Sequence, residues 1–244
     1  MTKIEAPKTA PPATPRTDFG KKVQAHVRYR NAAGAIVPGA TTILNGLAKP
    51  ALVGWANKLG LEGIDSRSYT SEAASVGTLA HYLIECQLGL SEPDLTDFTP
   101  AQLERAQTSL ASFNAWLVGH ELKPLMLEAQ LVSEQYGYGG TIDCYATLDG
   151  VPTLLDFKTS SGIYEEHKFQ VASYQRLLVE HEYDVQGVRI LRIGRDGGGL
   201  EEHRLTGEEC LAAWKVFQAA LVLYRAKQEF KAGAKVAAAP EAAA

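Results

Sequence analysis

Two aspartates and a lysine lie close together in a part of the chain that is rich in β-forming residues. Asp156 and Lys158 alternate with apolar residues, so a strand there would place the acid and the base on one face. Asp143 belongs to the preceding β-rich segment, and a hairpin turning at residues 149–150 can bring it beside Asp156. Two carboxylates that meet repel each other unless positive charge lies between them, and a hard divalent cation with oxygen ligands is the usual solution.

The same three residues also allow a simpler interpretation, an Asp–Lys salt bridge on a solvated sheet face. Further polar residues favour a functional site. Gln170 and Tyr174 are four residues apart on the apolar face of a predicted helix, so both side chains point inward and need partners. His81 follows a glycine-threonine pair in an earlier predicted helix, and Glu85 lies one turn further along the same face.

Four short blocks resemble the PD-(D/E)XK nuclease superfamily, and most of all its RecB-type and phage exonuclease branches. In order along the chain, the blocks cover residues 77–81, 140–143, 156–158 and 170–174. The resemblance implies an α/β fold with a restriction-endonuclease-like core, in which a mixed central sheet with an antiparallel meander is flanked by helices. The proline that gives the motif its name is missing, because a glycine, a threonine and an isoleucine precede Asp143.

The resemblance also implies a role for each residue of the metal site. Asp143 and Asp156 would be the metal-binding carboxylates, and the backbone carbonyl of Phe157 would add an oxygen ligand. Lys158 would orient the attacking water and help to deprotonate it, either as a base or as an electrostatic positioner. In this interpretation Asp143, Asp156 and Lys158 are the catalytic residues.

Residues around this centre receive supporting roles from the same resemblance. His81 matches a histidine that approaches the metal, and Glu128 falls where many relatives carry an acidic residue near it. Gln170 and Tyr174 match a block that borders the site and supports contact with DNA. We add Glu85 to this supporting group, because it shares a helix face with His81.

Two basic residues and one glycine-rich segment were considered as phosphate contacts. Lys168 and Arg176 flank the block at residues 170–174 and are candidate contacts, with solvated helix positions as the alternative for each taken singly. The segment at residues 194–199 superficially resembles a phosphate loop. It has no lysine and no following helix at the required spacing, so we expect a hairpin loop there.

The activity implied by the resemblance is that of a phage-derived DNA exonuclease that depends on Mg²⁺, with Mn²⁺ as a substitute, and serves recombination, replication or repair. DNA would be the substrate, and a single-strand annealing or binding protein a further partner. One alternative is a structure-dependent endonuclease, and another is a catalytically silent member that binds nucleic acid or protein. The presence of Asp143, Asp156 and Lys158 counts against a silent protein, because a binding module has no need of that strained cluster.

Composition narrows the class of protein. The chain of 244 residues is 45% hydrophobic and 21% charged, which suits one sizeable globular domain, and it has neither a membrane-length apolar run nor a signal-like N-terminus. We therefore expect a cytoplasmic protein with no membrane partner. A net charge of −4 argues against coating nucleic acid by bulk electrostatics, so any DNA contact must be local. The three cysteines are far apart, which argues against a zinc ribbon or an iron–sulfur cluster.

One domain is expected over residues 21–230, between a disordered leader (residues 1–20) and a disordered tail (residues 231–244) that offer no apolar period. Apolar periods predict the elements within it, including a crossover over residues 164–193 that returns to the sheet. The predicted helices cover residues 41–47, 51–61, 73–88, 99–118, 164–181 and 206–230. The predicted strands cover residues 125–133, 141–148, 153–158, 188–193 and 200–205, besides a small hairpin around residues 31–34.

Overall fold

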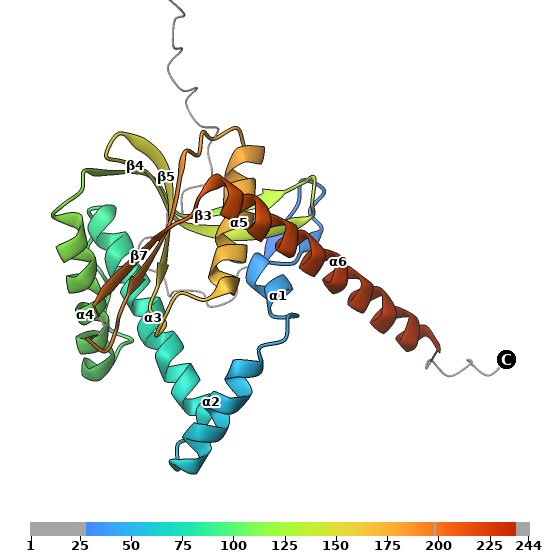
Figure 1. The fold of residues 1–244 in the computed structure, drawn as a ribbon, viewed down its shortest axis with the longest axis horizontal. Helices are drawn as coiled ribbons and strands as arrows, with labels where there is room; N and C mark the ends of the chain where they lie inside the picture. The colour runs from blue at the N-terminus through green and yellow to red at the C-terminus, as the bar shows by residue number, and fades with distance from the viewer. Residues whose placement is uncertain (1–27, 198, 238–244) are drawn as a thin grey trace, which may run out of the picture.

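A five-stranded mixed sheet lies between two layers of helices (Figure 1). The computed structural model describes residues 28–197 and 199–237. Along the sheet the strand order is β3-β4-β5-β6-β7. The strands are β3 (Leu122–Ser133), β4 (Tyr138–Leu148), β5 (Val151–Lys158), β6 (Gly187–Ile193) and β7 (Leu200–Arg204).

The first three strands form the predicted antiparallel meander. Asp149 and Gly150 connect β4 to β5 with φ angles of 52° and 82°, which is the left-handed pair that a tight hairpin turn requires. Strand β6 then pairs with β5 in parallel, after the chain has crossed over through α5 (Glu165–Glu180), and β7 returns antiparallel to β6. The mixed α/β class with a meander flanked by helices is therefore confirmed.

The two faces of the sheet are covered by different helices. On one face lie α3 (Ser66–Leu88) and α4 (Pro100–Leu117), and on the other lie α5, α6 (Gly207–Ala237) and the short α1 (Ala40–Leu44). The first core contains Ile84, Phe113, Cys144, Ala146, Leu148, Leu155, Phe157, Leu191 and Ile193. The second core includes Ile43, Ile142, Leu154, Tyr174, Leu177, Ile190, Trp214 and Phe217. None of the described helices is long and apolar enough to cross a membrane.

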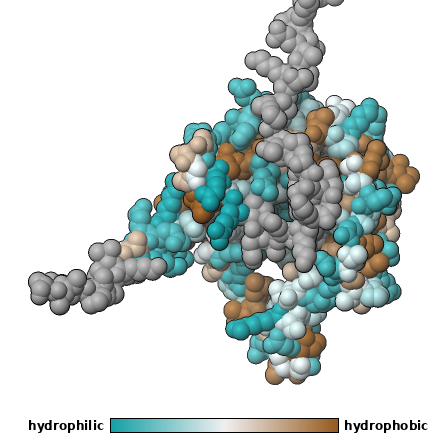
Figure 2. Space-filling view, turned by 180° about the vertical axis from the view of Figure 1, so that it is seen from behind, coloured by the Kyte–Doolittle hydropathy of each residue, from teal (hydrophilic) through white to brown (hydrophobic). Residues whose placement is uncertain are grey.

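Helix α2 (Pro50–Leu61) and the first turns of α3 form an arm that projects from the body (Figure 1). Pro50 opens α2 as predicted, and the ring of Trp55 meets the edge of Tyr69 at a centroid distance of 5.8 Å. The exposed large hydrophobic side chains of the arm are Leu52, Val53, Trp55, Leu61, Ile64 and Tyr69. Figure 2 shows apolar surface on this arm, at the bottom of the view. The other small element is the hairpin of β1 (Tyr29–Arg30) and β2 (Ile36–Val37).

Several element boundaries differ from the prediction because exposed turns carry no apolar period. Helix α3 begins at Ser66 instead of residue 73, where the Asp65 side chain accepts a hydrogen bond from the Ser68 backbone N–H at 2.6 Å. Helix α6 continues to Ala237, so the expectation of a disordered tail is wrong for residues 231–237. Its alanine- and lysine-rich sequence has high helix propensity without any need for a buried face. The expected leader and residues 238–244 lie outside the described residues.

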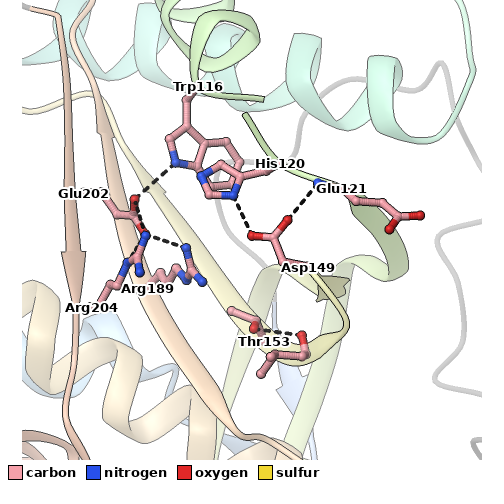
Figure 3. A network of polar contacts seen from close by, with 9 residues as sticks. Trp116, His120, Glu121, Asp149, Thr153, Arg189, Glu202 and Arg204 are labelled. Atoms are coloured by element: carbon pink, nitrogen blue, oxygen red, sulfur yellow. Dashed lines mark hydrogen bonds and ion pairs between the residues drawn. The ribbon is translucent and has the colours of Figure 1, made fainter. Parts of the chain in front are cut away.

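A polar network fixes the end of the sheet that lies opposite Lys158 (Figure 3). Nδ1 of His120 lies 2.6 Å from Oδ2 of Asp149, which ties the end of α4 to the β4–β5 turn. The Trp116 indole donates a hydrogen bond of 3.3 Å to Glu202, which links α4 to β7. These contacts hold α4 across the sheet. The candidate site lies at the other end of β5, away from this network.

Candidate active site

The two aspartates meet where β4 and β5 separate. The antiparallel ladder ends at the pair Cys144–Leu155, so Asp143 and Asp156 stand opposite each other just beyond it. There Oδ2 of Asp143 accepts a hydrogen bond of 2.8 Å from the backbone N–H of Phe157. A side chain thus takes the place of a ladder hydrogen bond, and the hairpin brings the two aspartates together as the sequence predicted.

Strict alternation of side chains breaks at this point, which corrects the prediction for β4. We expected Ile142 and Cys144 on the same face, but Ile142 lies in the core under α5 and α6 and Cys144 in the core under α3 and α4. Glu128 of β3, opposite Asp143 in the register, has a left-handed φ of 46°. That conformation costs roughly 1–2 kcal/mol outside glycine, and such strain is often found at functional sites.

Three side chains converge on one point. One ligand atom each from His81, Glu128 and Asp143 lie within 4.8 Å of one another, and Nδ1 of His81 is 3.6 Å from Oδ2 of Asp143. Helix α3 can bring His81 this close because of Gly77, where a Cβ atom would lie only 2.7 Å from Oγ1 of Thr159. An imidazole and two carboxylates at these separations can share one divalent cation.

Asp156 and Lys158 form a buried ion pair beside this group. Asp156 is 1% exposed, and its Oδ2 lies 2.5 Å from Nζ of Lys158, whereas its Oδ1 has no hydrogen-bond partner among the described residues. Burial raises the pKa of Asp156 to about 6; the charge of Lys158 opposes this rise and that of Asp143 adds to it. An orphaned carboxylate oxygen is costly to bury, and a cation beside it would remove that cost. The residues present therefore fit a divalent metal.

The same environment sets the charge state of the other ligands. Burial and the positive charge of Lys158 lower the pKa of His81 to about 4, so the imidazole is neutral at neutral pH and keeps a lone pair for a metal. Burial raises the pKa of Asp143, while Lys158 and the hydrogen bond from Phe157 oppose that rise.

These groups open into a central cleft of about 540 Å³. Six of the residues proposed from the sequence line it: His81, Glu85, Glu128, Asp143, Phe157 and Lys158. The remaining lining residues are Thr70, Ala73, Ala74, Gly77, Thr78, Tyr82, Thr159, Ser160 and Arg195. Asp156 is buried and does not line the cleft, whereas its ion-pair partner Lys158 does.

Gln170 and Tyr174 support the site from behind and do not line the cleft. The Gln170 amide donates a hydrogen bond of 2.7 Å to the Tyr174 hydroxyl, so these inward-facing groups satisfy each other. Burial, followed by the negative charge of Asp156, raises the pKa of Tyr174 well above 10. The Tyr174 ring packs over Gly140, where a Cβ atom would lie 2.6 Å from Cε1. A glycine at this position of β4 therefore lets α5 approach the site closely.

Lys168 and Arg176 are turned away from the cleft. Nζ of Lys168 lies 3.3 Å from Oε1 of Glu209, and the Arg176 guanidinium stacks over Trp214 at 5.6 Å from the ring centroid. Both partners belong to α6, because this face of α5 packs against that helix. Neither residue lines the cleft, and their contact with a phosphate stays a prediction.

The chain has only weak similarity to known proteins. No family model matches the chain, and no curated protein matches its sequence. A crystal structure of an alkaline exonuclease (LHK-Exo) from Laribacter hongkongensis matches with a TM-score of 0.38 at 12% identity, over 69% of this chain and 93% of that one. LHK-Exo in complex with dAMP matches with a TM-score of 0.36 at 13% identity, over 68% and 92% of the two chains. At these values the matches set neither the family nor the activity, and both are argued from the site.

Three residues lie near the site that were not predicted from the sequence. The Tyr29 hydroxyl lies 2.8 Å from Oγ1 of Thr141, and its ring covers Gly139. His167 is close enough to Lys158 for that charge to contribute, after burial, to lowering its pKa to about 3. Arg195 lines the cleft. The adjacent glycines at 139 and 140 were the available signal for Tyr29, because each leaves room for an aromatic ring. For Arg195 the only signal was its glycine-rich segment, and His167 had none.

Proposed function

We propose that this protein is a metal-dependent nuclease that hydrolyses phosphodiester bonds in DNA. The observation that carries the proposal is the buried Asp156–Lys158 pair, set opposite Asp143 at the edge of a cleft. A buried carboxylate oxygen without a hydrogen-bond partner, beside a second carboxylate, is an expensive arrangement that folding alone does not need. Its presence supports a catalytic role over a structural salt bridge.

The acidic residues and His81 would act together as metal ligands. His81, Glu128 and Asp143, whose ligand atoms lie close together, would hold a divalent cation. The sequence resemblance adds Asp156 and the backbone carbonyl of Phe157 as further ligands. Such a cation, when bound, activates water and stabilises negative charge on the phosphoryl and leaving oxygens. The strained backbone of Glu128 and the hydrogen bond from Phe157 to Asp143 hold two of these carboxylates in place before any ligand arrives.

Lys158 is the group that acts on water. Its ammonium is mostly buried and contacts Asp156 at 2.5 Å, so the carboxylate fixes its position at the cleft wall. From there it can donate a hydrogen bond to a water that faces the scissile phosphate and so orient that water. The Gln170–Tyr174 pair supports the other side of Asp156.

The finer proposal is an exonuclease that uses Mg²⁺, with Mn²⁺ as a substitute. The sequence resemblance to phage exonucleases supports this choice and extends it to a role in recombination, replication or repair, with a single-strand annealing or binding protein as a partner. The net charge of −4 supports it as well, because a long internal duplex would need a broad basic surface. End recognition requires only the cleft.

A single assay tests the activity. End-labelled linear DNA and covalently closed circular DNA are incubated with the metal-stripped protein plus Mg²⁺, Mn²⁺, Ca²⁺ or EDTA. We expect the linear DNA alone to be degraded with Mg²⁺ or Mn²⁺, and no turnover with Ca²⁺, whose looser coordination orients water poorly. Cleavage in EDTA would contradict the metal mechanism, rapid opening of circles would indicate a structure-dependent endonuclease, and binding without cleavage would indicate a silent member of the fold.

A further inference from the structure

The connection between β6 and β7 sends one arginine into the central cleft. Nη1 of Arg195 donates a hydrogen bond of 2.8 Å to the backbone carbonyl of Thr159, the residue that follows Lys158. Thr159 is also the residue against which α3 packs at Gly77, and Gly77 is four residues, or about 6 Å along the helix, from His81. Arg195 and the metal-ligand group therefore line the same cleft, with Thr159 in contact with both Arg195 and α3.

A second arginine keeps the charge of Arg195 available. Arg105 of α4 makes a two-pronged contact with Asp196, with Nε to Oδ1 at 2.8 Å and Nη2 to Oδ2 at 3.3 Å. Nε of Arg195 is 3.4 Å from Oδ2 of Asp196 but has no hydrogen-bond partner among the described residues. Asp196 thus makes two hydrogen bonds to Arg105 and only a longer ion pair to Arg195, whose side chain also lines the cleft.

The cleft has little other positive charge. Among its described lining residues the cations are Lys158, which is paired with Asp156, and Arg195, while Glu85, Glu128 and Asp143 supply negative charge. The hydroxyl residues Thr70, Thr78, Thr159 and Ser160 complete this part of the wall. A guanidinium beside hydroxyl groups suits a phosphate, because its planar N–H fork matches two phosphate oxygens.

We propose that Arg195 binds the DNA phosphate next to the one that is cleaved. The inference rests on the proposed function and deepens it, because it names the residue that sets where a strand lies relative to Asp143 and Lys158. Arg195 takes the place of the phosphate contacts that the sequence assigned to Lys168 and Arg176. The glycine-rich segment that contains it is a hairpin connection, as expected, yet it supplies an anion-binding side chain.

Equilibrium binding of fluorescent duplex ends in Ca²⁺ measures the contribution of Arg195 without cleavage. We expect Arg195→Gln to weaken binding about tenfold, to reduce the slope of log affinity against log salt by about 1, and to raise KM more than it lowers kcat. Arg195→Lys should recover part of the affinity, because it keeps the charge and loses the fork. Arg204→Gln is the matched control, since Arg204 lies on β7, pairs with Glu202 and does not line the cleft.

The neighbours of Arg195 provide a test that simple loss of structure would not pass. Arg105→Gln leaves Asp196 without its main partner, so Asp196 should pair with Arg195 and weaken DNA binding, although Arg195 is unchanged. Adding Asp196→Asn to that variant should restore binding. Thermal melts of each variant show whether the fold is intact.

Two outcomes would overturn the inference. One is an Arg195→Gln protein that is folded and binds DNA with unchanged affinity and salt slope. The other is a failure of Asp196→Asn to restore binding to the Arg105→Gln variant. If the unmodified protein binds DNA but never cleaves it with any metal, the proposed function fails while the binding role of Arg195 is still measured. If it binds no DNA at all, both fail together.

Discussion

Asp156 is almost completely buried, and burial raises the pKa of its carboxyl from 3.8 to about 6. Because the folded state holds this proton more tightly than the unfolded chain, the contribution of the group to stability is full below about pH 4 and is lost as the pH rises through about 6. The ionised Asp156 that a metal needs therefore destabilises the metal-free protein. Residues of this kind often trade stability for function.

The first prediction concerns the stability that the metal-free protein loses when Asp156 is ionised. Asp156→Asn should abolish cleavage and stabilise the metal-free protein near neutral pH by up to about 3 kcal/mol, the equivalent of a pKa rise from 3.8 to about 6. Denaturant titrations of both proteins in EDTA from about pH 4 to pH 8 measure this. The gain should vanish at the acid end, where both side chains are neutral. A gain of equal size at every pH would show that ionisation of Asp156 is not its cause.

The second prediction distinguishes Asp143, a proposed metal ligand, from Lys158, which is proposed to act on the attacking water. Asp143→Ala should weaken Mn²⁺ binding at least about tenfold, whereas Lys158→Ala should leave it unchanged or tighter, because Lys158 competes with the metal for Asp156. Both variants should be inactive. Calorimetric titration with Mn²⁺ makes the comparison. If Lys158→Ala loses the metal as severely as Asp143→Ala, the assignment of Lys158 as the residue that acts on water is wrong.

Some residues of the site are positioned by contacts between segments that are close in the sequence, and others by contacts between distant segments. Asp143, Asp156 and Lys158 could be predicted because alternation and one tight turn place them together. Arg195 could not, since its place in the cleft comes with a hydrogen bond to the carbonyl of Thr159, which lies 36 residues away in the sequence. Helical spacing could not show that Lys168 and Arg176 contact α6, because it states which residues share a face and not which neighbouring element that face meets.

At the scale of elements, close approach through glycine positions the site. Gly139 and Gly140 leave room for the rings of Tyr29 and Tyr174, and Gly77 lets α3 touch the residue after Lys158. The meander and the crossover were predictable from apolar periods. The break in alternation at Glu128 was not, because a glutamate gives no signal for a left-handed backbone.

The third prediction compares two glycines in helices. Gly77→Ala should destabilise the protein by about 1 kcal/mol or more and slow cleavage roughly tenfold or more, because the new methyl group meets Thr159 at 2.7 Å and must displace α3 or the end of β5. Gly54→Ala in α2 is the control. No atom lies within 4 Å of its Cβ position, so it should stabilise by up to about 1 kcal/mol.

Thermal melts and cleavage rates of the two alanine variants decide this point. Equal effects at both positions would mean that helix propensity alone governs them. An active and more stable Gly77→Ala protein would show that the contact between α3 and Thr159 does not set the position of His81.

At the scale of the whole molecule, the site uses only part of the chain. Beyond Tyr224 the described side chains of α6, residues 225–233, are exposed. The fourth prediction is that a protein ending at Gly233 melts within about 2 °C of the full chain and cleaves DNA at the same rate, because the described residues before the cut, 225–233, are exposed. A larger fall in Tm would show that the end of the chain packs against the body.

The whole-molecule charge also bears on how DNA is held. Under the proposed function, with a net charge of −4, the attraction of DNA into the cleft would come from Arg195, Lys158 and a divalent cation. Helix α2 and the start of α3 project beside that cleft, since Thr70 and Ala73 of α3 form part of its wall. The expected consequence is a preference for DNA ends, which need only this local contact.

The proposed function requires that the carboxylates opposite each other on β4 and β5, Asp143 and Asp156, hold a metal that promotes the hydrolysis of DNA. The most direct measurement is the rate of nucleotide release from linear DNA by the unmodified protein, Asp143→Asn and Asp156→Asn, each with Mg²⁺ and each with EDTA. We predict release by the unmodified protein with Mg²⁺ alone, and a rate lower by at least about a thousandfold in both variants. Release by either folded variant at a rate close to that of the unmodified protein would contradict the claim.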